Sequence, residues 1–133
     1  KAIELAKKSE LMNFGSSHIE WNIHDLLTQD YLLDRPDVIV CNPPYIKVEE
    51  KNIMDVNVLD FEPHLALFVY DSDPLLFYKI VIELFLDRQM PNIYFELNPL
   101  TADDLGLWCA EKGLNCQFRV DLSGKKRFAG ISK

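Results

Sequence analysis

Four consecutive residues, Asn42, Pro43, Pro44 and Tyr45, carry the strongest chemical signal in this sequence, because they directly follow a short apolar run. Proline has no amide hydrogen and fixes its own φ, and the residue before a proline is held extended. Two successive prolines therefore give a stiff turn whose carbonyl oxygens point outward. The Asn42 carboxamide oxygen and the Pro43 carbonyl oxygen could each accept one hydrogen from a substrate NH2 group.

Such a fork would hold a planar amide or amine nitrogen in front of an electrophile. An amide nitrogen is a weak nucleophile, so positioning has to contribute much of the rate enhancement. Carbonyl dipoles would also stabilise positive charge that develops on the nitrogen, and the Tyr45 ring could lie against the flat substrate group. The alternative is that the two prolines only break a loop. A transfer reaction to a planar nitrogen is the chemistry that the turn favours.

A sheet has to position this turn. Residues 37–41 are a β-branched apolar run, which predicts a strand buried on both faces of a sheet. Residues 46–72 carry little secondary-structure signal and are expected to form a long loop of the kind that is usually functional. The remaining patterns predict helices over 1–12, 74–86 and 101–112, and strands over 18–23, 92–97, 116–120 and 127–131.

This order of elements indicates an α/β fold with a mainly parallel sheet and an antiparallel C-terminal hairpin. Active sites in such sheets lie beyond the carboxyl ends of the strands. Asn42 is therefore expected at the same edge as Glu96–Asn98, which end a neighbouring predicted strand.

Composition narrows the choice of partners. The chain has 133 residues and a net charge of −7, without an extended basic patch, so DNA is not an expected partner and a basic protein surface suits it better. Three cysteines without a CxxC pair indicate reduced thiols in a cytoplasmic protein. No apolar run approaches the ~20 residues of a membrane span, so no membrane is expected. The three histidines lack ligand spacing, so no metal is expected either.

Over essentially its whole length the chain resembles the HemK/PrmC family of peptide-chain release factor glutamine methyltransferases. NPPY alone is shared with nucleic-acid adenine methyltransferases, whereas NPPYI followed by FEP..AL and DLSGK.RF is specific to the glutamine enzymes. The stretches that carry the resemblance are HDLL around Asp25, DVIVCNPPYI at 37–46, FEPHLAL at 61–67, LLFYKI at 75–80, YFELNP at 94–99 and DLSGKKRFAG at 121–130.

The resemblance implies a Rossmann-like fold and methyl transfer from S-adenosylmethionine to the side-chain amide nitrogen of a protein glutamine, with release factors as the protein substrates. It implies that Asn42 and Pro43 are catalytic residues that hold the acceptor amide. Pro44 and Tyr45 would shape the pocket of that amide.

The resemblance also implies roles for residues outside the turn. Asp25 would approach the adenine of S-adenosylmethionine, and Asn42 would contribute to the same cofactor site. Glu62 and Pro63 would belong to a loop that closes over the substrate. The alternatives are that Asp25 only caps a helix and that residues 61–63 only pack a loop. Glu96 could belong to the site or could cap the end of a strand.

The chain departs from the family in ways that make the cofactor site incomplete. Its five glycines, at 15, 106, 113, 124 and 130, form no glycine-rich turn. Residues 97–99 read Leu-Asn-Pro where the family often has glycine and glutamine. The N-terminal helical domain of the family has no counterpart, so residues 1–133 are expected to be the C-terminal part of one methyltransferase catalytic domain.

The missing part of the domain has a consequence for the sheet. The first two strands of the family's sheet lie between the strands expected at 18–23 and 37–41, so both would have an exposed edge here. Exposed edges invite pairing, so we expect these strands either to pair with each other or to associate with another chain.

Two alternatives to a glutamine methyltransferase stay open. One is a nucleic-acid adenine N-methyltransferase, against which the acidic charge and the FEP and DLSGK.RF stretches argue. The other is a catalytically inert fragment that acts only as an acceptor-binding module.

Overall fold

The computed structural model of the chain describes residues 1–28, 36–53, 56–70, 72–86 and 91–133. It contains two compact units, Lys1–Leu32 and Leu33–Lys133, which are described here one at a time. None of the helices in these described ranges combines the length and the apolar character needed to cross a lipid bilayer.

The first unit contains the predicted N-terminal helix, α1 (Ala2–Phe14). Gly15 ends the helix in the left-handed conformation, with φ 71°, and its N–H bonds the carbonyl of Leu11. That conformation is open to glycine without the steric cost that a Cβ would bring.

The predicted strand over residues 18–23 is wrong. The Glu10 carboxylate accepts the backbone N–H groups of His18 and Ile19 and, at 2.8 Å, the indole N–H of Trp21. The first two backbone donors of the segment and the Trp21 indole are therefore bound by one residue, Glu10, which is only 4% exposed. These bonds, the one from Trp21 foremost, hold the pKa of Glu10 below its ordinary value. Because residues 18–23 form no strand, the expected pairing of this segment with the strand at 37–41 does not occur.

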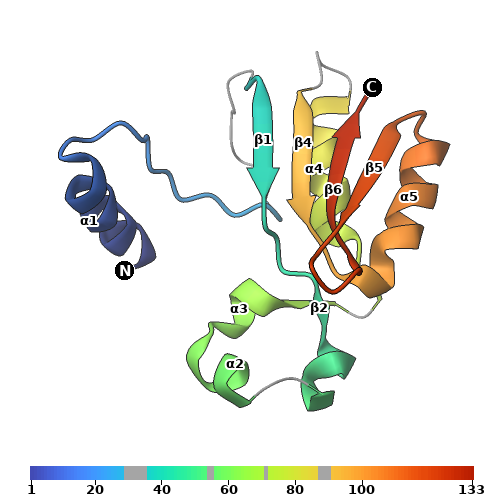
Figure 1. The fold of residues 1–133 in the computed structure, drawn as a ribbon, viewed down its shortest axis with the longest axis horizontal. Coiled ribbons are helices and arrows are strands. Elements are labelled where there is room, and N and C mark those ends of the chain that lie inside the picture. The colour runs from blue at the N-terminus through green and yellow to red at the C-terminus, as the bar shows by residue number, and fades with distance from the viewer. Residues whose placement is uncertain (29–35, 54–55, 71, 87–90) are drawn as a thin grey trace. The chain divides into compact units, whose positions relative to one another are not determined.

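The second unit is built on a four-stranded sheet of order β1-β4-β6-β5 (Figure 1). Its strands are β1 (Val38–Cys41), β4 (Asn92–Glu96), β5 (Asn115–Val120) and β6 (Lys126–Ser132). β1 runs parallel to β4, and β5 and β6 form the predicted antiparallel hairpin. The α/β class is confirmed. A mainly parallel sheet is not confirmed, because among the described pairs of this sheet only β1–β4 is parallel.

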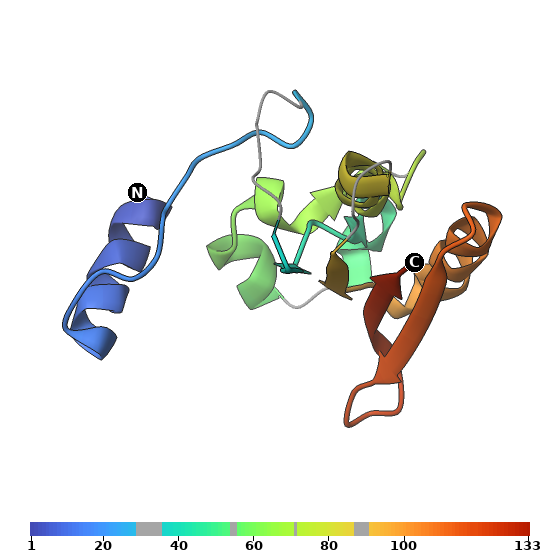
Figure 2. The ribbon, with the colours of Figure 1, turned by 90° about the horizontal axis from the view of Figure 1, so that it is seen from above.

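Two helices, α4 (Leu76–Leu86) and α5 (Ala102–Glu111), lie on one face of this sheet (Figures 1 and 2). Both confirm predicted helices. The core lies between these helices and the sheet, where the Tyr78 ring meets the Phe95 ring edge-to-face at 5.1 Å. Other fully buried core residues are Ile82, Ile93, Leu97, Leu105, Cys109 and Ile131.

The opposite face of the sheet is partly open in the described structure. Side chains alternate between the two faces of a strand, and on this face Val40 is 82% exposed while Val38, Tyr94 and Phe128 are also exposed. The prediction that residues 37–41 are buried on both faces is therefore wrong. The reason is that α4 and α5 cover only the other face.

The segment predicted as a structureless loop over 46–72 contains several short elements instead. β2 (Ile46–Lys47) pairs in parallel with β3 (Phe68–Val69), so the two ends of the segment lie side by side. Between them come a 3-10 helix (Val48–Ile53), α2 (Val56–Phe61) and α3 (His64–Leu67). Figure 1 shows this group beyond the carboxyl end of β1. Elements of two to six residues are too short to produce a periodic sequence signal.

Candidate acceptor site

The turn of residues 42–45 lies where it was predicted, directly after β1 and at the edge where the carboxyl ends of β1 and β4 meet. The parallel register places Cys41 opposite Phe95, so Asn42 and Glu96 follow at the same edge. Asn42 is exposed, whereas Pro43 is buried. The first residue of the turn is therefore open to a ligand while the second is fixed by its surroundings.

A cleft of about 320 Å³ brings together four of the residues that the sequence singled out. Three of them, Asn42, Pro43 and Tyr45, come from the turn. Glu62 belongs to the segment between β2 and β3, whose two ends pair with each other. The cleft is completed by apolar groups, which are Ile46, Ala66 and Leu67. The arrangement is a small pocket lined by both polar and apolar residues.

Two predicted substrate residues do not line this cleft. Pro44 is half-buried within the turn. Pro63 stands before the first turn of α3, where its carbonyl accepts the N–H of Ala66 at 2.8 Å. The position of Pro63 gives it a structural role in starting α3, beside any role in binding substrate.

Tyr45 is held at its hydroxyl by Glu96 and at its backbone carbonyl by Asn98, the two residues on either side of Leu97 at the end of β4. Its hydroxyl donates to Glu96 Oε1 at 2.9 Å, and its carbonyl accepts from Asn98 Nδ2 at 3.3 Å. Burial, and then the neighbouring Glu96 carboxylate, raise the pKa of Tyr45, while Arg127 acts in the opposite direction. The phenol therefore stays protonated at neutral pH and acts as a hydrogen-bond donor. Of the two roles considered for Glu96, this contact places it beside the site.

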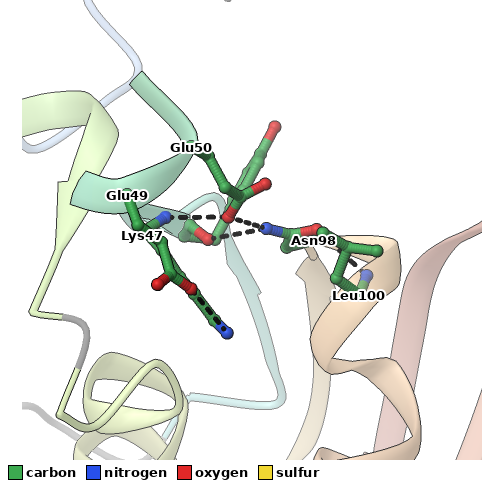
Figure 3. A network of polar contacts seen from close by, with 6 residues as sticks. Lys47, Glu49, Glu50, Asn98 and Leu100 are labelled. Atoms are coloured by element: carbon green, nitrogen blue, oxygen red, sulfur yellow. Dashed lines mark hydrogen bonds and ion pairs between the residues drawn. The ribbon is translucent and has the colours of Figure 1, made fainter. Parts of the chain in front are cut away.

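A polar network behind the turn was not predicted from the sequence (Figure 3). Glu50 Oε1 accepts the backbone N–H of Lys47 at 3.0 Å and Asn98 Nδ2 at 2.8 Å. Asn98 Oδ1 in turn accepts the N–H of Leu100 at 3.0 Å. Asn98 had one signal in the sequence, its position directly after a strand and before a proline, as in Asn42-Pro43. Glu50 had none.

Asp25, the predicted adenine contact, lies in the first unit. Its Oδ1 accepts the N–H of Leu27 at 2.9 Å, and its carbonyl accepts the N–H of Thr28 at 3.2 Å. These contacts stabilise a turn over residues 25–28, and no helix follows Asp25 directly within the described residues, so the alternative of a helix cap is not shown. The adenine contact itself stays a prediction.

Among the residues that the structure describes, only Asp25 and Asn42 are predicted to contact S-adenosylmethionine, and the five glycines of the sequence form no glycine-rich turn. The cofactor site is therefore expected to be incomplete in this chain. A second cavity of about 410 Å³ lies on the open sheet face and is also bordered by Asn42, together with Val40, Tyr94 and Glu96. Groups in either cavity can therefore reach Asn42. Within the described ranges, no cluster of three or more His, Cys, Asp or Glu side chains could hold a metal ion.

No model of a protein family matches the chain. Individual proteins do match it. It is 46% identical to the release factor glutamine methyltransferase of Flavobacterium psychrophilum, over 99% of this chain and 47% of that protein. It is 32% identical to the enzyme of the same name from Leptospira interrogans, over 100% of this chain and 47% of that protein. A bifunctional methyltransferase of Rickettsia bellii is 37% identical over 78% of this chain and 19% of its own length.

The chain thus spans about half the length, or less, of the curated relatives that it matches. The match nevertheless runs through the turn, the Glu62 segment and the hairpin, since it covers nearly all of the 133 residues. By this likeness the chain belongs to the family of release factor glutamine methyltransferases, the HemK/PrmC family that its motifs resemble.

Proposed function

We propose that the protein carrying this chain methylates the side-chain amide nitrogen of a glutamine in a peptide-chain release factor, with S-adenosylmethionine as the methyl donor. The observation that carries the proposal is the cleft in which Asn42, Pro43, Tyr45 and Glu62 meet. A small pocket lined by Asn42 and Pro43, which carry oxygen acceptors, and by apolar residues suits a side chain that is aliphatic along its stem and ends in a flat NH2 group.

The chemistry of the acceptor follows from the turn. The Asn42 side-chain oxygen and the Pro43 carbonyl would each take one hydrogen of the substrate NH2 group, which fixes the direction of the nitrogen. As the nitrogen forms its new bond to carbon it gains positive charge, and both oxygen dipoles stabilise that charge. S-adenosylmethionine would supply the electrophilic methyl group: its S–CH3 bond would break, the donor would leave as a neutral thioether, and the nitrogen would lose one proton to solvent.

Tyr45 and Glu62 would confine the substrate. The Tyr45 ring cannot swing freely, because its hydroxyl is bonded to Glu96 and its carbonyl to Asn98. A ring fixed in this way can act as one wall for the planar amide. Glu62 is exposed at the cleft and could contact the backbone of the substrate protein around its glutamine.

The test is methyl transfer by the complete protein that carries this sequence, with labelled S-adenosylmethionine and a release factor. Asn42→Ala should lower kcat by about 10²- to 10³-fold, the usual loss when one preorganised polar group is removed from a transition state. Because Asn42 is exposed, the free energy of unfolding of the Asn42→Ala variant should differ from that of the unmodified protein by less than about 0.5 kcal/mol. Asn52→Ala, an exposed asparagine that does not line the cleft, is the matched control.

Equal activity of the Asn42→Ala and Asn52→Ala variants would contradict the proposed role of Asn42. Two further arms test the alternatives. Transfer to DNA or RNA in place of the release factor would identify an adenine methyltransferase. Calorimetric titration of S-adenosylmethionine into the 133-residue chain, beside the complete protein, tests whether the chain alone is only an acceptor-binding module.

A further inference from the structure

We propose that Asn98 and Glu50 are positioning residues for methyl transfer, which rests on the proposed function and adds two residues to the site. They are not proposed to touch the reacting nitrogen or the methyl donor. They act through Tyr45, by fixing the place where the acceptor turn leaves the end of the sheet.

Asn98 uses its whole carboxamide for this purpose. It is only 5% exposed. One hydrogen of its NH2 group goes to the Tyr45 carbonyl at 3.3 Å and the other to Glu50 Oε1 at 2.8 Å. Its oxygen accepts the N–H of Leu100 at 3.0 Å. A buried amide with all three contacts made can take only one orientation, so it fixes the Tyr45 carbonyl relative to the end of β4.

Glu50 closes the network from the other side of the turn. Its Oε1 accepts the Asn98 amide and also the backbone N–H of Lys47, the residue two positions after Tyr45. One carboxylate oxygen of Glu50 therefore links Lys47, in the chain that leaves the turn, to Asn98, which holds the Tyr45 carbonyl (Figure 3). The neighbouring Glu49 does not do this, because its carboxylate pairs with the Lys47 ammonium at 3.3 Å.

The consequence for catalysis comes from how little freedom is left between the anchors. Before the turn, Cys41 is fixed by its register with β4. After it, the Tyr45 carbonyl is fixed by Asn98 and the hydroxyl by Glu96. Only residues 42–44 lie between, and two of them are prolines with a fixed φ. Displacing such a preorganised group by about 1 Å can cost 10²-fold in rate, so loosening the rear anchor should lower kcat.

Asn98→Asp tests this with almost no change of shape. The new carboxylate can still accept the N–H of Leu100, but it has no hydrogens for Tyr45 or Glu50 and places negative charge against Glu50. In the complete protein, we expect kcat to fall by at least about tenfold while KM for the release factor changes little, because the substrate surface is intact. Asn52→Asp, which adds the same charge within the same 3-10 helix as Glu50, should leave kcat unchanged.

The double variant E50Q/N98D separates positioning from a general loss of structure. The glutamine amide at position 50 can donate to the new carboxylate at position 98 and can still accept the N–H of Lys47. We expect it to recover part of kcat, though not all, since the Tyr45 carbonyl still lacks its donor. E50Q alone, measured in parallel, is the reference against which the recovery in the double variant is judged.

Hydrogen exchange of the Lys47 amide supplies a readout that does not depend on activity. Its exchange should accelerate in N98D and slow again in E50Q/N98D. An unchanged kcat in N98D would overturn the positioning role. So would an E50Q/N98D variant in which the Lys47 amide again exchanges slowly but kcat stays as low as in N98D. If the unmodified protein methylates no glutamine, the proposed function fails, and the exchange pattern alone then decides whether Asn98 and Glu50 hold the turn.

Discussion

The hydrogen bond from the Tyr45 hydroxyl to Glu96, at 2.9 Å, should make these two residues energetically coupled although 51 positions separate them. A double-mutant cycle with Tyr45→Phe and Glu96→Ala measures the coupling. Hydrogen bonds to charged groups contribute about 1.5–3 kcal/mol when well buried. Both side chains here are only half-buried, so water competes, and we expect a coupling of about 1 kcal/mol.

The assay is urea unfolding of the complete protein and its three variants, at several pH values. Burial, followed by the charge of Glu96, raises the pKa of Tyr45 in the folded state. The folded protein therefore holds this proton more tightly than the unfolded chain does. The stabilisation is fully present below the ordinary tyrosine pKa of about 10 and is lost as the pH rises through the folded-state pKa. The coupling should be constant from about pH 7 to 9 and decline above about pH 10.

The control for this cycle is Tyr45→Phe combined with Glu83→Ala. Glu83 is exposed on α4 and pairs with Lys112, so its effect should simply add to that of Tyr45→Phe. A Tyr45–Glu96 coupling below about 0.3 kcal/mol at pH 7 to 9 lies within ordinary additivity error and would refute the reasoning. Tyr45 would then not be anchored by Glu96, and its ring could not serve as a fixed wall of the acceptor cleft.

Burial raises the pKa of Cys41 to about 11, so iodoacetamide at pH 8 should label it far more slowly in the folded protein than in urea, and equal rates by mass spectrometry would contradict this. Gly124 turns the hairpin at φ 75° with no neighbouring atom in the way of a Cβ, so Gly124→Ala should cost about 1 kcal/mol in urea unfolding from backbone strain alone. We also propose that the 133-residue chain self-associates through the outer edge and open face of β1. Sedimentation should show an average mass that rises with protein concentration and that is lower in the Val40→Glu variant. A monomer at every concentration would refute the proposal.

The predictions from sequence succeeded where a local signal was strong. The helix from Leu76 to Leu86 has an apolar stripe at helical spacing, and the hairpin from Asn115 to Ser132 has a glycine turn between alternating residues. β1 was located by its β-branched run. In each case the residues of a single element, or of two elements that are adjacent in the sequence, are enough to favour the observed conformation.

They failed where the deciding partner was elsewhere in the chain. The alternation of Ile19, Trp21 and Ile23 is a valid strand pattern, but the Glu10 carboxylate binds the Trp21 indole and the backbone N–H groups at the start of the segment. A periodic pattern states which side chains share a face and says nothing of what will cover that face. The exposure of Val40 has the same origin, because its β-branched neighbours indicate a strand but not the number of layers around it.

The site shows the same division. A role for residues 42–45 can be proposed from the sequence because the four residues are adjacent, and their chemistry stays a prediction. The cleft brings Asn42, Pro43 and Tyr45 together with Glu62, which lies at a distance along the chain. Asn98 was expected at this edge of the sheet, but neither its contacts nor any role for Glu50 could be predicted from the sequence. Their proposed positioning role depends on contacts with Lys47 and Tyr45 that only the fold creates.

The end of β4 explains why this site can be rigid while its own residues are partly exposed. Leu97 is fully buried, and its N–H donates to the Arg127 carbonyl at 2.9 Å, so the backbone there is fixed by the core and by the neighbouring strand. The residues on either side of it, Glu96 and Asn98, both turn to Tyr45. The hydrophobic core therefore sets the position of the acceptor turn through a single buried residue and its two polar neighbours. The position of residues 42–45 therefore depends on contacts behind the turn as well as on the turn itself.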